Sequence, residues 1–133
     1  MLYRTLLAVF SIVLLSLAGC GSIAKSKKES ALDATLGRYG DSIRWGYFET
    51  AHNFVHPDQR KDVPKHLDNI RVTDYQVVQG PLTTNETSVE QVVRIQYVHR
   101  DRQMVRSLLD RQLWRYEKEA NAWWLYSGFP QFD

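Results

Sequence analysis

Hydrophobic residues recur at spacings of three and four near the start of the globular part of the chain. This period predicts an amphipathic helix whose apolar face comprises Leu32, Leu36, Tyr39, Ile43, Tyr47, Ala51 and Phe54. Ser30 is the expected N-cap, with Asp33 at the capping-box distance. The helix is expected to end before His56-Pro57, because the residue before a proline avoids helical geometry. Three glycines, Gly37, Gly40 and Gly46, weaken this helix and indicate either a close approach to a sheet or a break near Gly40-Asp41.

Further along the chain the helical period gives way to alternation. We expect four strands, over Ile70–Val78, Val89–His99, Met104–Lys118 and Trp123–Tyr126. Between the first two, Gly80–Glu86 is expected to be a turn or a loop. The stretch Pro57–Asn69 before the first strand is polar, and Pro64–Leu67 within it is expected to be a short helix or an irregular cover. A helix followed by consecutive strands with short connections predicts the α+β class, with an N-terminal helix packed on a curved antiparallel sheet of about four strands.

The first twenty residues have a pattern of their own. Arg4 precedes the apolar run Leu6–Leu15, and small residues then lead to Cys20, the single cysteine of the chain. The alternative, a transmembrane anchor, is disfavoured because spanning a bilayer takes about 20 apolar residues. The stretch Leu17-Ala18-Gly19-Cys20 resembles a bacterial lipobox, at which the cysteine thiol receives a diacylglyceryl group and the preceding segment is removed.

This resemblance implies a domain organisation and an address. Residues 1–19 are expected to be a lipoprotein signal peptide, 20–29 the lipidated cysteine and a flexible tether, and 30–133 a single α+β domain. The residue directly after the cysteine is Gly21 and not aspartate, and in this the chain resembles lipoproteins sent to the outer membrane. We therefore expect a protein anchored by lipid in the outer membrane, rather than the inner one, and facing the periplasm. A net charge of +2 without a basic stripe disfavours nucleic acid as a partner.

The globular part resembles the nuclear transport factor 2-like superfamily. The residues that carry the resemblance are Trp45-Gly46-Tyr47 in the helix and, in the last hairpin, Gln112, Trp114, Tyr116, Trp123, Trp124 and Leu125. The cystatin-like fold shares the same helix-on-curved-sheet plan, and small outer-membrane assembly lipoproteins combine helices with a sheet. The superfamily includes isomerases, hydrolases, dehydratases and pockets without known chemistry, so the fold does not decide the function. A homodimer that forms through the sheet would be consistent with membership of this superfamily.

Two aspartates are candidate bases if the protein is an enzyme. Enzymes of this type use a carboxylate in an apolar cone, and alternation places Asp74 on one face with Ile70 and Val72. Asp110 shares a face with Gln112, Trp114 and Tyr116 in the same way. The simpler interpretation is that both aspartates pair with arginines across strands. Without a second acid or nucleophile at a telling spacing, no catalytic residue and no cofactor is predicted.

His52 and His56 have the spacing of four residues with which two imidazoles can bind zinc from one helix face. Pro57 follows at once, however, and places His56 at the helix end. We therefore expect a solvated pair at a helix C-terminus and predict no metal.

Aromatic residues are concentrated in the helix and the last hairpin. The candidate binding surface comprises Trp45, Trp114, Trp123, Trp124 and Tyr126. Adjacent Trp123 and Trp124 must face opposite sides of a strand, so one of them can fill the core and the other can pack under the Pro57–Asn69 cover. The C-terminal segment 127–133 either folds back on the domain or serves as a docking peptide.

Taken together, these patterns favour a lipid-anchored binding or accessory module of the bacterial envelope that has no catalytic chemistry. Its candidate partners, besides the membrane, are an envelope protein or an apolar ligand. The alternatives are a small cofactor-independent enzyme of the nuclear transport factor 2-like type, using a pocket carboxylate, and an accessory lipoprotein for outer-membrane assembly.

Overall fold

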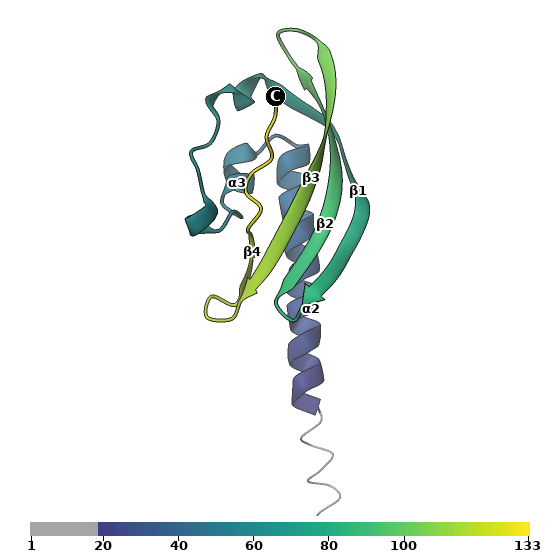
Figure 1. Ribbon diagram of the computed structural model, residues 1–133, viewed down its shortest axis with the longest axis vertical. Helices are drawn as coiled ribbons and strands as arrows, with labels where there is room; N and C mark the ends of the chain where they lie inside the picture. The colour runs from purple at the N-terminus through teal and green to yellow at the C-terminus, as the bar shows by residue number, and fades with distance from the viewer. Residues whose placement is uncertain (1–18) are drawn as a thin grey trace, which may run out of the picture. The chain divides into compact units, whose positions relative to one another are not determined.

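The structure, a computed structural model, describes residues 19–133 (Figure 1). Its elements are α2 (Gly19–Arg44), α3 (Phe48–His52), η1 (Pro57–Gln59), η2 (Lys65–Asn69), β1 (Ile70–Asn85), β2 (Ser88–His99), β3 (Met104–Glu117) and β4 (Ala122–Leu125). The described chain divides into two units between Ala34 and Thr35, and the second unit, 35–133, holds the sheet. The predicted signal peptide and the side chain of Cys20 lie outside what the structure describes.

The long helix α2 differs from its prediction at the N-terminal side. Helix runs through 20–29, where the sequence predicts a flexible tether, and continues through Ser30, which therefore caps nothing. The reason is local. The segment 24–29 contains alanine, lysine and glutamate, which are strong helix formers, and it has no proline.

At its other end α2 stops earlier than predicted, at Arg44, and a separate short helix follows. The backbone N–H of Gly46 donates to the carbonyl of Ile43 (3.2 Å) and that of Tyr47 to the carbonyl of Ser42 (2.8 Å). With Gly46 at a φ of 77°, this pattern is a Schellman motif, in which a left-handed glycine ends a helix. The break predicted near Gly40-Asp41 is therefore wrong in position.

The sheet has the order β1-β2-β3-β4, and every neighbouring pair is antiparallel. Strands β2 and β3 follow the predicted ranges closely. The loop expected over Gly80–Glu86 is wrong, because β1 continues to Asn85 and pairs with β2 as far as Ser88. Proline is tolerated there because β1 is an edge strand, and register shifts absorb the irregular residues.

One of those register shifts changes which side chains of β1 face inward. It lies between Val72 and Asp74, so that Tyr75 follows Ile70 and Val72 onto the covered face and Asp74 is exposed. The predicted alternation, which placed Asp74 with Ile70 and Val72, fails beyond Val72. The reason is that a bulge adds one residue and reverses the side-chain alternation.

Within the second unit, the part of α2 from Thr35 onward covers the inner face of the sheet (Figure 1). Tyr39 and Ile43 are fully buried, and the Tyr39 ring meets Trp114 edge-on at 5.2 Å between centroids. A Cβ at Gly40 would lie 2.9 Å from the Tyr75 ring, so this glycine permits the close approach of helix to sheet. The predicted α+β class, a helix on a four-stranded antiparallel sheet, is confirmed.

The C-terminal segment folds back on the domain. Phe132 is buried, with its ring 5.0 Å from Tyr97 and 5.5 Å from Phe48. His66 Nε2 meets the carbonyl of Phe132 at 2.9 Å, and the backbone N–H of Asp133 donates to the Tyr97 hydroxyl at 3.2 Å. Of the two interpretations of this segment, the structure supports the one in which it closes the domain.

Candidate functional site

The turn between α2 and α3 presents two exposed aromatic side chains. Trp45 and Tyr47 each expose 65% of their surface and flank Gly46, whose Schellman hydrogen bonds fix the turn. Side chains this exposed contribute little to the core. Tryptophan and tyrosine on a rigid turn are typical of sites that recognise a partner, where they dominate the binding energy.

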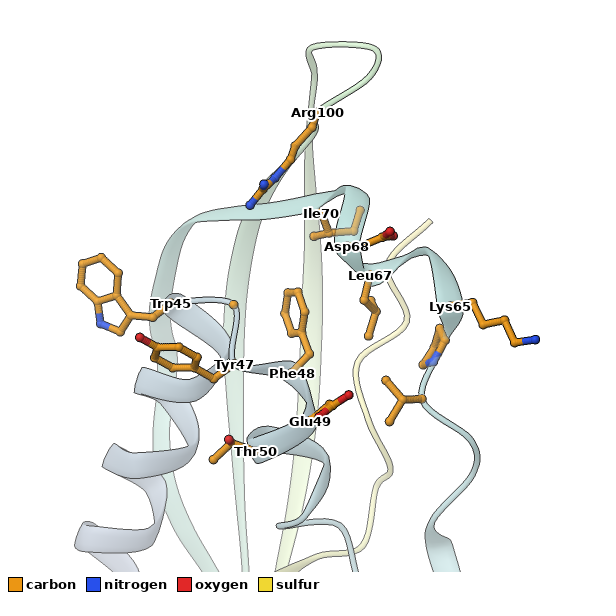
Figure 2. Close-up of a pocket in the computed structure, with 13 residues that line it drawn as sticks. Trp45, Tyr47, Phe48, Glu49, Thr50, Lys65, Leu67, Asp68, Ile70 and Arg100 are labelled. Atoms are coloured by element: carbon orange, nitrogen blue, oxygen red, sulfur yellow. The ribbon is translucent and has the colours of Figure 1, made fainter.

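An open hollow of about 630 Å³, called here the groove, lies beside this turn. Figure 2 shows its apolar floor, made by Phe48, Leu67 and Ile70, all of which are buried. Its rim is aromatic and charged and includes Trp45, Tyr47, Glu49, Lys65, Asp68 and Arg100. The groove therefore joins the end of α2, α3, η2, the start of β1 and the β2–β3 turn. Its volume falls within the range of known ligand sites.

A second hollow, of about 420 Å³, adjoins the groove and shares Trp45, Gly46, Ile70 and Arg100 with it. It is called here the arginine hollow, because Arg44, Arg71 and Arg100 line it together with Val72 and Thr73. The Arg44 guanidinium donates to the carbonyl of Val72 at 3.0 Å and lies 4.8 Å from the centroid of the Trp45 ring. No carboxylate among the described residues lines this hollow.

Two of the predicted surface aromatics belong to the core instead. Trp114 is completely buried and donates its indole N–H to Gln112 Oε1 at 3.1 Å. Trp123 exposes 6% of its surface, and its ring lies 5.4 Å from that of Tyr116. Both are buried side chains on the adjacent strands β3 and β4, so they pack in the core and are not part of an exposed surface.

Trp124 and Tyr126 lie elsewhere and are half-buried. The burial of Trp123 beside half-buried Trp124 agrees with the prediction that the two face opposite sides. The Tyr126 ring stacks on His56 at 4.6 Å, and Arg115 covers Tyr126 at 4.7 Å from the ring centroid. Neither Trp124 nor Tyr126 lines the groove or the arginine hollow, so Trp45 alone of the five predicted residues is at this site.

The structure places the two candidate bases, Asp74 and Asp110, in different environments. Asp74 is exposed on β1 and cannot act inside the domain. Asp110 exposes 8% of its surface and faces inward with Gln112 and Trp114, as predicted. Its expected pairing with an arginine across strands is wrong, because Asp110 lies opposite Val93 and accepts a hydrogen bond from Gln112 Nε2 at 2.7 Å.

Asp110 belongs to a buried polar cluster. Gln112 Nε2 also donates to the Tyr75 hydroxyl at 3.1 Å, and Gln91 Nε2 donates to Gln112 Oε1 at 2.7 Å. Burial raises the pKa of Asp110 to about 6, partly offset by the Gln112 hydrogen bond. The Tyr39 hydroxyl is buried without a hydrogen-bond partner in the described part of the chain, and burial together with Asp110 raises its pKa. Asp110 lines neither the groove nor the arginine hollow.

The histidine pair is not solvated, which corrects the prediction. His52 and His56 each expose 9% of their surface. α3 ends at His52, so the spacing of four residues does not place both rings on one helix face. His52 Nε2 meets the carbonyl of Lys61 at 2.5 Å, and His56 Nδ1 accepts from the backbone N–H of Asp58 at 3.2 Å. Over residues 19–133, no group of three or more His, Cys, Asp or Glu side chains could hold a metal ion.

Sequence reasoning missed the arginines of this site. Arg44 ends a helix, Arg71 lies near the start of a strand and Arg100 begins a hairpin turn, so the sequence does not group them. Strand pairing brings the last two together: Ile70 lies opposite His99, and the backbone N–H of Arg100 donates to the carbonyl of Asn69 at 2.9 Å. A correct register for the first two strands would have been the signal.

Comparison with known proteins gives no match to a protein-family model, a curated protein or a solved structure. None of the helices in the described region is long and apolar enough to cross a membrane.

Proposed function

We propose that the protein is a lipid-anchored binding or accessory module of the bacterial envelope, which holds a partner protein in the groove and carries out no reaction of its own. The lipobox-like sequence supports attachment through Cys20, in the outer membrane and facing the periplasm. The observation that carries the binding function is the rigid, exposed pair Trp45 and Tyr47 beside an apolar hollow.

The form of the groove favours a protein partner over a small apolar ligand. Small-molecule sites enclose most of the ligand's surface. Here the groove is an open hollow above the buried side chains of Phe48, Leu67 and Ile70, and charged side chains form much of its rim. An apolar side chain of a partner can reach this floor while the partner's backbone contacts Trp45 and Tyr47, as in interfaces built around aromatic anchors.

A cofactor-independent enzyme remains a second candidate, on the strength of Asp110. A buried carboxyl whose pKa is raised to about 6 has the protonation behaviour of a general base or acid near neutral pH, and the Tyr75 and Tyr39 hydroxyls lie close by. The core around it is filled, with Trp114 and Tyr39 fully buried. A substrate would have to open this core, which makes binding in the groove the better-supported function.

The binding function can be tested with a photo-crosslinking amino acid placed at Thr50, on the rim of the groove, in cells that produce the full chain. The matched position is Leu109 on β3, which is 55% exposed and lines neither hollow. We expect one discrete envelope protein to crosslink from position 50 and not from position 109.

Trp45→Ala should reduce that crosslink about tenfold, the effect of losing an aromatic anchor worth about 1.4 kcal/mol or more. Because Trp45 is largely exposed, the variant should keep the thermal unfolding midpoint of the wild type. Equal crosslinking from positions 50 and 109, or none from position 50, would rule out the groove as the binding site. The identity of the captured protein also tests the assembly alternative, since an assembly factor should capture outer-membrane protein machinery.

A further inference from the structure

The groove and the arginine hollow are two parts of one surface that differ in charge. They meet at Trp45, Gly46, Ile70 and Arg100, which line both. In the groove the charges balance, because two carboxylates, Glu49 and Asp68, and two cations, Lys65 and Arg100, line it. In the arginine hollow they do not, because three guanidinium groups line it without a carboxylate from the described chain.

Within the described part of the chain, the three arginines also lack acidic partners. Among the described residues, no salt bridge within 4.0 Å uses Arg44, Arg71 or Arg100. Arg44 is held in place by its hydrogen bond to the Val72 carbonyl and by stacking on Trp45. Three like charges around one hollow repel one another, and an anion placed between them would relieve that repulsion.

We infer that the partner inserts an acidic side chain into the arginine hollow and a neighbouring apolar side chain into the groove. This inference rests on the proposed function and names the chemistry of the partner: an extended segment that carries aspartate or glutamate next to a large apolar residue. The planar guanidinium fork matches a carboxylate in two hydrogen bonds, and Trp45, shared by both hollows, contacts the residues on either side.

An anionic lipid surface is the competing source of negative charge, and the structure disfavours it. Glu49 and Asp68 line the groove directly beside the arginine hollow and would be repelled by a uniformly anionic surface. The floor of the groove consists of Phe48, Leu67 and Ile70, which are buried and so offer little apolar surface to a flat layer of headgroups. A peptide can fit both hollows, because its acidic side chain and its apolar side chain lie at different positions along the peptide.

The test uses the full chain with the crosslinker at Thr50 and measures the yield of the envelope adduct in arginine variants. Arg71→Gln and Arg100→Gln should each reduce the yield about tenfold, and raising the salt concentration should weaken the wild type more than either variant. Arg94→Gln is the matched control, because Arg94 is an exposed arginine on β2 that lines neither hollow. Its yield should equal that of the wild type.

Added competitors distinguish the sources of the anion. Synthetic heptapeptides with glutamate beside leucine should suppress the crosslink at concentrations at least tenfold lower than matched peptides with glutamine in place of glutamate. If phosphatidylglycerol vesicles or inorganic phosphate compete as well as the acidic peptides, the hollow binds phosphate groups and the inference is wrong.

The two proposals fail in different ways. A crosslink from position 50 that persists unchanged in both Arg71→Gln and Arg100→Gln overturns the acidic-segment inference and leaves the groove as a binding site. Absence of the crosslink in the wild-type chain overturns the binding function itself.

Discussion

Asp110 shows what a single residue's environment adds to its position in the sequence. Alternation along β3 correctly placed its side chain on the face of Gln112 and Trp114. Alternation could not reveal that Asp110 would hydrogen-bond to Gln112 and not to an arginine. The choice of partner depends on how completely the helix covers that face of the sheet. Coverage is a property of the packed domain, and it also determines how strongly a carboxyl is desolvated.

The buried carboxyl makes the stability of the domain depend on pH. Because the pKa of Asp110 is about 6 in the folded state and near 3.8 when unfolded, the folded state holds this proton more tightly. Its contribution is most favourable below about pH 4 and is lost as the pH rises to about 6, a cost of up to about 3 kcal/mol at pH 7. Asp110→Asn should therefore stabilise the domain at pH 7.5, by up to that amount, and change little at pH 4.

Urea unfolding at pH 4, 5, 6 and 7.5 measures this difference. Asp74→Asn is the control, since Asp74 is an exposed aspartate on a neighbouring region of the sheet, and its effect should be small at every pH. If the Asp110→Asn difference does not grow between pH 4 and pH 6, the carboxyl is not desolvated as described.

At the scale of the element, the helix shows that glycines of similar appearance have different roles. The sequence predicted an amphipathic helix with Tyr39 and Ile43 on its buried face, and both are buried. It could not tell Gly37, Gly40 and Gly46 apart. Gly37 meets nothing, Gly40 lies against the Tyr75 ring, and Gly46 takes a left-handed conformation to end the helix. Only tertiary contact and backbone φ distinguish them.

Gly37→Ala and Gly40→Ala therefore form a matched pair with opposite expected effects. Gly37→Ala should stabilise the domain by about 0.5–1 kcal/mol through helix propensity, because its Cβ meets no atom within 4 Å. Gly40→Ala should destabilise it by about 1–2 kcal/mol, because its Cβ would lie 2.9 Å from a Tyr75 ring that Gln112 holds by hydrogen bond. Chemical denaturation at pH 7.5 measures both, and a stabilising Gly40→Ala would contradict the close packing.

Gly46→Ala isolates backbone strain. Nothing lies within 4 Å of the added Cβ, so the expected loss of about 1 kcal/mol comes only from holding alanine at a φ of 77°. If the turn is needed to present Trp45 and Tyr47, the crosslink from position 50 should also decrease. Equal stability of Gly46→Ala and the wild type in denaturant would mean that the turn does not hold the left-handed conformation.

In the strands too, the sequence pattern predicts some features and the pairing between strands determines the others. β2 alternates over most of its length, with Val93, Ile95 and Tyr97 buried, so its range and its buried face could be predicted. β1 could not, because its bulge between Val72 and Asp74 exchanges the faces, and only the register against β2 reveals it. The exposure of Asp74 and the half-buried position of Tyr75 follow from that one shift.

At the scale of the whole molecule, the candidate binding site could be predicted only in part. The sequence selected aromatic residues as candidates, and packing placed Trp114 and Trp123 in the core and left Trp45 exposed. The arginine hollow draws on segments far apart in the chain and exists only after the strands pair. The lipobox-like leader is different, because a processing signal is recognised as a linear sequence and needs no fold.

The anchor is therefore testable independently of the fold. We expect Cys20→Ala to abolish labelling by radioactive palmitate and to prevent removal of residues 1–19, since lipid attachment precedes cleavage in the lipoprotein route that the resemblance implies. Gly21→Asp is the informative companion: it keeps the cysteine, so labelling should persist, while the mature protein should shift from outer-membrane to inner-membrane fractions on a sucrose gradient. Undiminished labelling of Cys20→Ala would remove the anchor from the proposal. Labelled Gly21→Asp that remains in the outer-membrane fraction would show that another feature determines its destination.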